Sequence, residues 1–382
     1  MKVTFYSNFL NHHQLPFCKE MVKILGDNFK FVATEKIPDD RIKLGYDDMN
    51  DKYNFVVKDY ENKEEALRLA RESDIIIIGS APNTYMQVAI KSGKLCFRYS
   101  ERIHRTGFKL KIWASLIKNF TFKEYKNVYL LCSSAYTSMD FAKSFAYYNK
   151  AYKWGYFPEV IPYKDINKLI DDKEKNSILW VSRFIELKHP EYVVEIAKRL
   201  KKEGYDFTIN MIGIGEIQTQ ITEMIKGFGL EKNIKILGAM SPEKVRENME
   251  KSKIFLFTSD RKEGWGAVLN ESMNSGCAVV ANSEIGSVPF LIKDKENGLI
   301  YEDGNIENLY NNVKLLLDNS KLCDKLGTEA YNTMIGLWNP KVAAERLIEL
   351  AKDLKKYKKC NRFEDGPCSI AKRLKDNWYK SK

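Results

Sequence analysis

The stretch that decides the fold runs from Thr258 to Val280 and reads TSDRKEGWGAVLNESMNSGCAVV. The apolar residues 253–258 predict a buried strand, and a helix is predicted from near Gly266 to Gly276, where glycine suits a left-handed helix end. Between them, Gly264 and Gly266 let the backbone approach a ligand closely. Because the first amides of a helix carry partial positive charge, we expect a phosphate-binding site here.

Two carboxylates belong to the same place. Glu263 lies in the loop, and Glu271 follows about one and a half turns into the helix. A carboxylate repels phosphate, so the expected partners are hydroxyl groups, which a sugar and a ribose on either side of a diphosphate would supply. Taken alone, two glutamates at this spacing more often belong to a solvated helix face, so the assignment depends on motifs elsewhere in the chain.

Strand-like apolar runs alternate with helical patterns on both sides of this stretch. This rhythm predicts an α/β fold of two Rossmann-like, doubly wound domains that face each other across a cleft. A polar run at 163–176 separates them, giving an N-terminal domain at 1–165 and a C-terminal domain at 176–345. The predicted strands are 2–7, 29–34, 54–58, 74–79, 94–99 and 128–132, then 177–182, 206–212, 233–237, 253–258, 277–281 and 298–301.

Composition removes several classes of protein. The 382 residues are 44% hydrophobic, which is enough for two large cores and argues against disorder. No apolar run reaches the roughly 18 residues of a membrane helix, and the first residues show no secretory signal, so we expect a cytoplasmic protein. Seven cysteines without a C-x-x-C pair and only four histidines argue against a disulfide framework or a zinc site.

The net charge of +11 is concentrated in two stretches. Residues 98–126 hold eight Lys and Arg against two Glu, and residues 341–382 hold thirteen against six acidic residues. In the first stretch Phe108, Ile112, Leu116 and Phe120 form a helical apolar stripe beside the lysines, most often a core face but also suited to an anionic membrane surface. A protein that binds nucleic acid through dispersed charge is a poor fit, because the rest of the chain is close to neutral.

Glu263 and Glu271 resemble the Glu-x7-Glu arrangement of retaining glycosyltransferases of family 4, which have the two-domain GT-B fold. The run VSRFIELKHP at 181–190 is similar to the family's Arg-x4-Lys element. The resemblance implies that Arg183 and Lys188 hold the donor diphosphate, that Glu271 binds the ribose, and that Glu263 binds the transferred sugar. It also implies that a last helix, predicted from Cys368 to Lys380 within about 360–382, crosses back to the N-terminal domain.

Other donor-binding residues follow from the same resemblance. The Gly-x-Gly turn after residues 206–212 and the strand end near Gly238 are similar to the nucleotide side of the family's site, although a lone Gly-x-Gly is also a common tight turn. In place of the family's Gly-Gly-x-Pro-Glu, the chain has Ser287 for the second glycine and Phe290 for the glutamate. The expected donor-binding residues are therefore Gly213, Gly215, Gly238, Gly264, Trp265, Gly266, Ala267, Val268 and Glu271.

The first loop and a later strand end offer candidate acceptor contacts. His12 and His13 follow the first predicted strand, and we expect His13 to take part in catalysis because a helix begins beside it. Glu101 and Arg102 stand roughly where the family has a His-x-His pair. Each could equally be a solvated or structural residue, since loop histidines and Glu-Arg pairs often are.

The expected activity is a hexosyltransferase reaction from a nucleotide-sugar, with a UDP-sugar favoured, to a glycan or lipid-linked glycan in cell-surface polysaccharide or glycoconjugate synthesis. No cofactor and no metal are expected, because there is no Asp-x-Asp motif and Arg183, Lys188 and helix amides supply the positive charge. The expected location is cytoplasmic, with peripheral contact to anionic membrane and no nucleic-acid partner. The alternatives are a nucleotide-sugar epimerase of similar architecture and, from another class, a basic nucleic-acid-binding protein.

Overall fold

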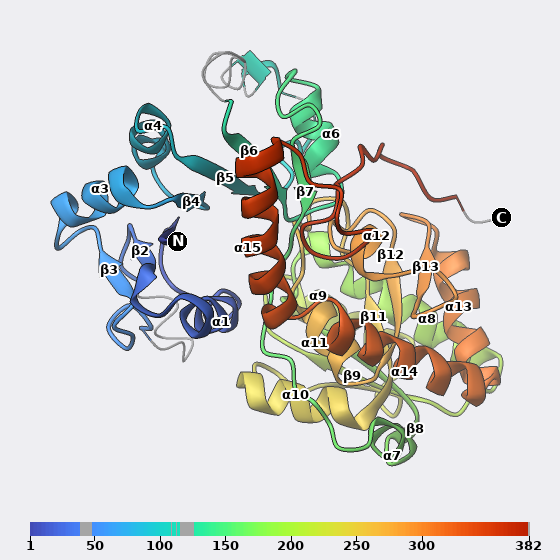
Figure 1. Ribbon diagram of the computed structural model, residues 1–382. Coiled ribbons are helices and arrows are strands. Elements are labelled where there is room, and N and C mark those ends of the chain that lie inside the picture. The colour runs from blue at the N-terminus through green and yellow to red at the C-terminus, as the bar shows by residue number, and fades with distance from the viewer. Residues whose placement is uncertain (39–47, 108, 112, 115–125, 381–382) are drawn as a thin grey trace. The chain divides into compact units, whose positions relative to one another are not determined.

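The computed structural model describes residues 1–38, 48–107, 109–111, 113–114 and 126–380 (Figure 1). The chain divides into two compact units. Unit 1 comprises Met1–Glu159 and Trp338–Leu374, and unit 2 comprises Val160–Leu337 and Lys375–Lys382. The chain therefore first passes from unit 1 to unit 2 between Glu159 and Val160, just before the polar run at 163–176.

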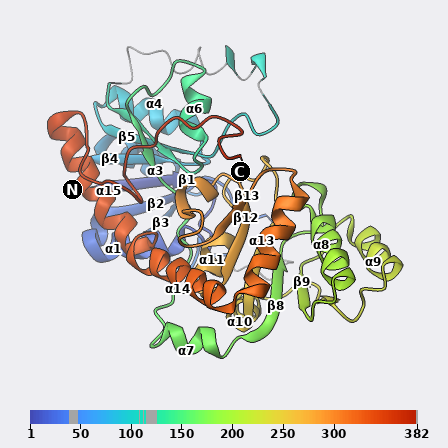
Figure 2. The same ribbon diagram turned by 90° about the vertical axis from the view of Figure 1, so that its right-hand side faces the viewer.

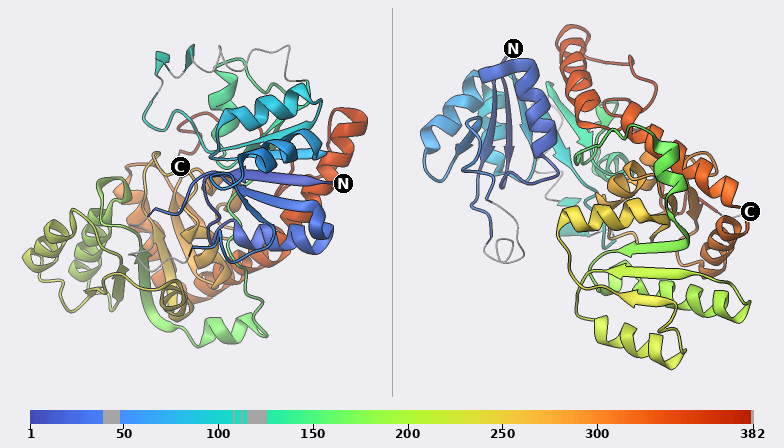
Figure 3. Two further views of the ribbon diagram at one scale, coloured as in Figure 1. Left: turned by 90° about the vertical axis from the view of Figure 1, so that its left-hand side faces the viewer. Right: turned by 90° about the horizontal axis from the view of Figure 1, so that it is seen from below.

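Within the described residues, unit 1 is built on a seven-stranded parallel sheet in the order β3-β2-β1-β4-β5-β6-β7. Contacts join α3 to α4 and, separately, α1 to α15, and Figure 3 shows α1 and α3 on different sides of the sheet. The strands are β1 Val3–Ser7, β2 Phe29–Ala33, β3 Val56–Lys58, β4 Ile75–Ile78, β5 Leu95–Ser100, β6 Val128–Cys132 and β7 Ala151–Lys153; the helices are α1 Leu15–Leu25, η1 Gly26–Asn28, α3 Lys63–Glu72, α4 Asn83–Lys91, α6 Thr137–Ala142 and α15 Pro340–Tyr357.

Unit 2 repeats the plan, with a described six-stranded parallel sheet in the order β10-β9-β8-β11-β12-β13. Contacts join α8 to α9 and α13, and α11 to α10 and α14, as Figure 2 shows. The strands are β8 Glu174–Val181, β9 Thr208–Ile212, β10 Ile234–Ile236, β11 Ser252–Phe257, β12 Ala278–Asn282 and β13 Leu299–Tyr301; the helices are α7 Ile166–Asp171, η2 Glu186–Lys188, α8 Pro190–Lys202, α9 Gln218–Gly227, α10 Pro242–Lys251, α11 Val268–Asn274, α12 Val288–Leu291, α13 Ile306–Asp318 and α14 Ser320–Gly336.

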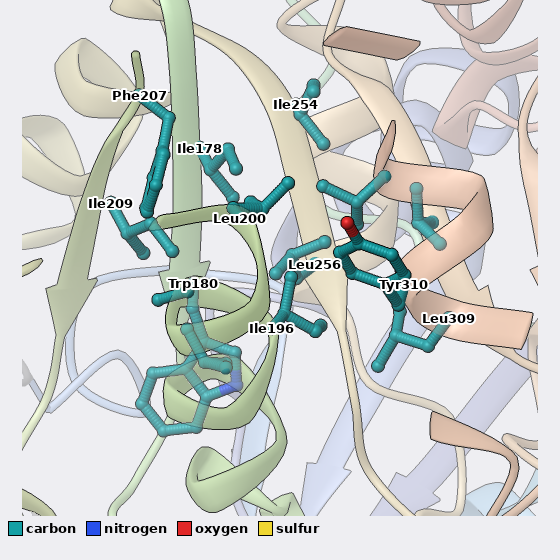
Figure 4. Close-up of a cluster of buried hydrophobic side chains, with 14 of the residues drawn as sticks. Ile178, Trp180, Ile196, Leu200, Phe207, Ile209, Ile254, Leu256, Leu309 and Tyr310 are labelled. Carbon is teal, nitrogen blue, oxygen red and sulfur yellow. The ribbon is translucent and has the colours of Figure 1, made fainter. Parts of the chain in front are cut away.

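The core of unit 2 shows why these segments become strands and helices. Alternate residues of β8 and β11, including Trp180 and Leu256, point toward Ile196 and Leu200 of α8 and Tyr310 of α13 (Figure 4). Both faces of the sheet are covered, so its strands are apolar on both sides, as the continuous apolar runs of the sequence predicted. This packing fixes the carboxyl ends of the strands, from which the candidate site is built.

The predicted helix from Cys368 to Lys380 is wrong. Cys368 is in a left-handed conformation at φ 66°, and its backbone N–H donates to the Lys153 carbonyl at 2.8 Å. Lys153 donates back to Ser369, and Ala371 donates to Ala151, so the segment pairs along the exposed edge of β7. Covering a sheet edge satisfies more backbone groups than a short helix would, which explains the difference.

Candidate functional site

The candidate site of unit 2 is built from loops at the carboxyl ends of β8, β9, β10 and β11. A Cβ atom on Gly213 would lie 1.8 Å from the Ser182 carbonyl oxygen, and one on Gly215 would lie 2.3 Å from that of Phe184. Both glycines are therefore required for the β9 loop to touch the β8 loop. Gly213 also donates to the Gly238 carbonyl at 2.8 Å, which brings the β10 loop into the same group.

Lys188 and Glu263 meet at the centre of these loops. Their side chains form an ion pair, each about one-seventh exposed, and Ser259 donates a second hydrogen bond to the same Glu263 oxygen at 3.1 Å. The sequence placed both residues in one site, and the structure brings them together. Ser259 was not predicted, although it stands in the same loop four residues before Glu263.

Arg183 and Glu271 are left open to a ligand. Arg183 is exposed, and its guanidinium makes no hydrogen bond or ion pair within the described part of the chain. Glu271 is half-buried on α11, and its carboxylate likewise has no such partner among the described residues. Burial raises the pKa of Glu271 to about 7, although the positive charge of Arg246 opposes the rise.

The loop between β11 and α11 packs against the ring of Phe257. Gly266 has φ 78°, and a Cβ atom there would lie 2.2 Å from the ring of Phe257. The helix begins at Val268 after Ala267, two residues later than the sequence suggested, and Gly276 follows its end at φ 68°. Gly264 is buried in this loop.

Trp265 supports the loop rather than lining its open side. Its ring is fully buried, and its indole N–H donates to Asn270 at 2.8 Å. Ser287 donates to the Trp265 carbonyl, and the ring of Phe290 lies 6.4 Å from that of Trp265. Ser287 and Phe290, the two residues that depart from the family pattern, thus pack around Trp265.

In unit 1, three of the predicted acceptor residues gather around a tyrosine that the sequence analysis missed. The rings of His12 and His13 lie 3.7 Å apart, and His13 stacks on Tyr156 at 5.8 Å. The Tyr156 hydroxyl donates to the Glu101 carboxylate. Tyr156 follows β7, a three-residue strand whose pattern is too short to be recognised, so no signal pointed to it.

Arg102 is a structural residue, contrary to its predicted role in acceptor binding. Its side chain is fully buried, lies 4.4 Å above the Tyr136 ring and is 3.6 Å from the Asp140 carboxylate. Such a guanidinium cannot reach a ligand at the surface. The predicted stripe of Phe108, Ile112, Leu116 and Phe120 lies outside the described residues.

The described residues hold neither a metal-binding cluster nor a membrane-spanning helix. No cluster of three or more His, Cys, Asp or Glu there is arranged to hold a metal ion. None of the described helices combines the length and hydropathy needed to cross a bilayer.

Comparison with known families identifies the domain that carries these loops. Residues 163–333 match the family described as glycosyl transferases group 1. This segment therefore resembles a group 1 glycosyltransferase domain. It contains Arg183, Lys188, Glu263 and Glu271 together with the glycines of the loops after β9, β10 and β11.

Two curated relatives each match a little less than half of the chain. Poly(ribitol-phosphate) alpha-N-acetylglucosaminyltransferase of Staphylococcus aureus is 27% identical over 172 residues, which cover 44% of this chain and 34% of that protein. N-acetylgalactosamine-N,N'-diacetylbacillosaminyl-diphospho-undecaprenol 4-alpha-N-acetylgalactosaminyltransferase of Campylobacter jejuni is 29% identical, over 47% of this chain and 46% of that protein. The match spans less than half of each relative's own length.

Solved structures show the fold over nearly the whole chain. Anabaena HepE, crystallised in complex with UDP, superposes with a TM-score of 0.69 at 14% identity, over 93% of this chain and 100% of that one. The pneumococcal O-GlcNAc transferase GtfA gives a TM-score of 0.65 at 12% identity, over 93% and 99%. The chain, with its two Rossmann-like units, thus has the GT-B fold.

Proposed function

We propose that the chain transfers a sugar, with retention of anomeric configuration, from a UDP-sugar to a glycan or lipid-linked glycan. One observation carries the proposal: Lys188 and Glu263 form an ion pair among loops whose glycines permit close backbone approach, and neither Arg183 nor Glu271 has a side-chain partner among the described residues. Cations suit a diphosphate, and carboxylates suit hydroxyl groups. The chain then works in cell-surface polysaccharide or glycoconjugate synthesis, in contact with the inner face of the membrane.

Each residue has one task in this reaction. Arg183 and Lys188 hold the diphosphate and stabilise the charge that grows on it as the bond to the sugar breaks. Glu271 accepts hydrogen bonds from the ribose, and Glu263 accepts them from the sugar. The acceptor oxygen forms the new bond to the anomeric carbon on the side that the diphosphate leaves, and its proton passes to a leaving phosphate oxygen.

The names of similar proteins support the donor and acceptor classes. The S. aureus relative is named for N-acetylglucosamine transfer to poly(ribitol phosphate), and the C. jejuni relative for transfer to a diphospho-undecaprenol glycan. HepE was crystallised with UDP and with UDP-glucose. Uridine nucleotides and polymeric or lipid-linked acceptors therefore head the list to be tested.

The test is thermal stabilisation by a panel of UDP- and GDP-sugars. A donor present at 100 times its Kd adds about 2.7 kcal/mol to the protein's free energy of unfolding, so the protein's melting temperature rises. The stabilising donor is then incubated with and without glycan acceptors, and the anomeric configuration of the product is read by NMR. Interconversion of the donor without any acceptor would support an epimerase instead, and stabilisation by no nucleotide-sugar would contradict the proposal.

A further inference from the structure

His189 stands between the two loops that carry Lys188 and Glu263. It follows Lys188 directly and precedes α8, with a left-handed backbone at φ 48° and ψ 53°. Few residues other than glycine adopt this conformation, and histidine is among those that do so more often. The ring contacts the first turn of α8 and also reaches the loop that follows β11, where Asp260 lies.

The imidazole is held by groups from two elements. Its Nδ1 lies 2.6 Å from Glu191 Oε1, its Nε2 lies 3.8 Å from Asp260 Oδ2, and its ring stacks on Tyr192 at 4.6 Å and 15°. Glu191 and Tyr192 belong to α8, whereas Asp260 belongs to the loop of Glu263. Lys262 also faces this cluster, with its Nζ 3.4 Å from Asp260 Oδ2.

The imidazole is positively charged at neutral pH. The carboxylates of Asp260 and Glu191 raise the pKa of His189 to about 9, although burial opposes the rise. Burial would raise the pKa of Asp260, but the nearby His189 imidazole and a hydrogen bond from the Lys262 backbone N–H lower it below its ordinary value. Both partners are therefore ionised at pH 7, and the contact is an ion pair between the loops.

Donor binding would remove one link between the two loops. Without a donor, the Lys188–Glu263 ion pair joins the two loops directly. When Lys188 turns to a diphosphate and Glu263 turns to sugar hydroxyls, that link is lost. Among the described residues, two hydrogen bonds still join the loops: the Asp260 backbone N–H donates to the Leu187 carbonyl at 2.9 Å, and the Thr258 hydroxyl donates to the Lys188 carbonyl.

We propose that His189 is a positioning residue that keeps the loops of Lys188 and Glu263 together while both side chains engage the donor. This inference rests on the proposed function. It assigns His189 no contact with the substrate. Its charge acts through Asp260, three residues before Glu263, so the loop keeps the spacing that a diphosphate and a sugar require.

The decisive variant is His189→Asn, because asparagine also tolerates the left-handed backbone but carries no charge. Hydrogen exchange at pH 7, without any ligand, should become faster in residues 258–264 than in the wild type. The Kd for UDP at pH 7 should rise about fivefold, the equivalent of one partly exposed ion pair of about 1 kcal/mol. The ratio of the Kd of His189→Asn to the Kd of the wild type should fall toward one above pH 9, where the wild-type imidazole loses its proton.

Two further variants act as controls. Glu191→Gln removes only one of the two carboxylates, so the Kd ratio should still change with pH but with a midpoint lower than that of the wild type. Glu195→Gln lies one turn further along α8, where it contacts Arg199 instead of His189, and should behave as the wild type.

The outcomes separate this inference from the proposed function. Unchanged hydrogen exchange in residues 258–264 of His189→Asn would overturn it whether or not UDP binds. Unchanged UDP affinity, with faster exchange or a lower melting temperature, would make His189 a structural residue only and overturn the positioning role. Failure of the wild type to bind UDP would count against the proposed donor, while the exchange measurement would still decide the link between the loops.

Discussion

Glu271 is a half-buried carboxylate whose pKa burial raises to about 7. Because its pKa is higher in the folded chain than in the unfolded chain, the folded state loses stability as pH rises from about 4.5 through 7. Glu271→Gln removes this penalty. We expect its melting temperature to exceed that of the wild type at pH 8 and the difference to shrink toward pH 4.5, as measured by circular dichroism. A difference independent of pH would contradict the raised pKa.

Arg183 and Lys188 are expected to act on the rate, since they stabilise charge that develops on the leaving diphosphate. Arg183→Ala or Lys188→Ala should raise the barrier by about 2 to 4 kcal/mol, measured as the loss of kcat/KM in the transferase assay. Glu263→Ala should lower mainly kcat, because the sugar changes charge in the transition state. The control is Lys202→Ala, an exposed cation at the end of α8.

We expect EDTA to leave the rate unchanged, and restoration of an EDTA-inhibited rate by Mg²⁺ would contradict a metal-independent reaction.

The resemblance to the family's motifs placed Lys188 and Glu263 in one site, and their positions after parallel strands bring them to one edge of the sheet. It failed for Arg102 because nothing in a single sequence distinguishes a strand-end arginine at the surface from one buried over Tyr136. His189 gave no signal either, since its charge depends on Asp260, which lies 71 positions away in the chain. The role of a residue can thus be predicted where a motif fixes the backbone, but not where contacts with distant parts of the chain decide its environment.

Among the secondary-structure elements, the long apolar strands were predictable and the short or edge elements were not. β4 reads as four isoleucines, a pattern with one reasonable interpretation, and its observed bounds are Ile75–Ile78. β7 has three residues, and the helix α14 was not predicted at all. The pairing of residues 368–371 with β7 depends on a sheet edge that forms only in the folded chain.

The last described residues make contacts that the sequence did not predict. Within unit 2, Asp376 pairs with Arg261 at 3.3 Å, Asn377 donates its backbone N–H to Glu284 at 2.7 Å, and Trp378 donates to the Ser283 carbonyl at 3.1 Å. Glu284 begins the segment that departs from the family's Gly-Gly-x-Pro-Glu pattern. The tail thus anchors the loops after β11 and β12.

Trp378→Ala should therefore loosen the loop after β12. We expect faster proteolysis near residues 283–287 and a melting temperature lower by about 2 to 4 °C for each kcal/mol lost. Lys380→Ala, which changes an exposed residue of the same tail, should leave both unchanged. Equal proteolysis of the two variants would show that the tail does not hold this loop.

At the scale of the whole molecule, much of the positive charge belongs to unit 1. Residues 98–126 lie in it, and most of the basic residues of 341–382 lie in its returning segment Trp338–Leu374. Trp113 donates its indole N–H to the Lys143 carbonyl at 2.9 Å, and Arg373 lies 3.8 Å above the Tyr148 ring. These contacts connect both basic stretches to residues 143–148.

The same part of unit 1 exposes large apolar side chains. Leu110 is 72% exposed, Phe145 55% and Tyr148 50%, and Lys143 and Arg373 are exposed among them. Apolar side chains surrounded by cations suit an anionic bilayer, where each cation contributes about 1 kcal/mol. A lipid-linked acceptor presents its phosphates at the same surface, so one unit would meet both the bilayer and the substrate.

Sedimentation with vesicles tests this membrane contact. We expect the wild type to bind phosphatidylglycerol-containing vesicles at low salt, to dissociate at high salt, and to ignore phosphatidylcholine vesicles, because the attraction is electrostatic. Lys143→Glu should weaken binding at least fivefold, since it replaces an attractive charge with a repulsive one, and Phe145→Ser should weaken it at both salt concentrations. Lys226→Glu, an exposed lysine on α9 of unit 2, is the matched control for charge. If the wild type fails to sediment with anionic vesicles at low salt, the acceptor meets the enzyme away from the bilayer, and the exposed lysines and arginines serve solubility alone.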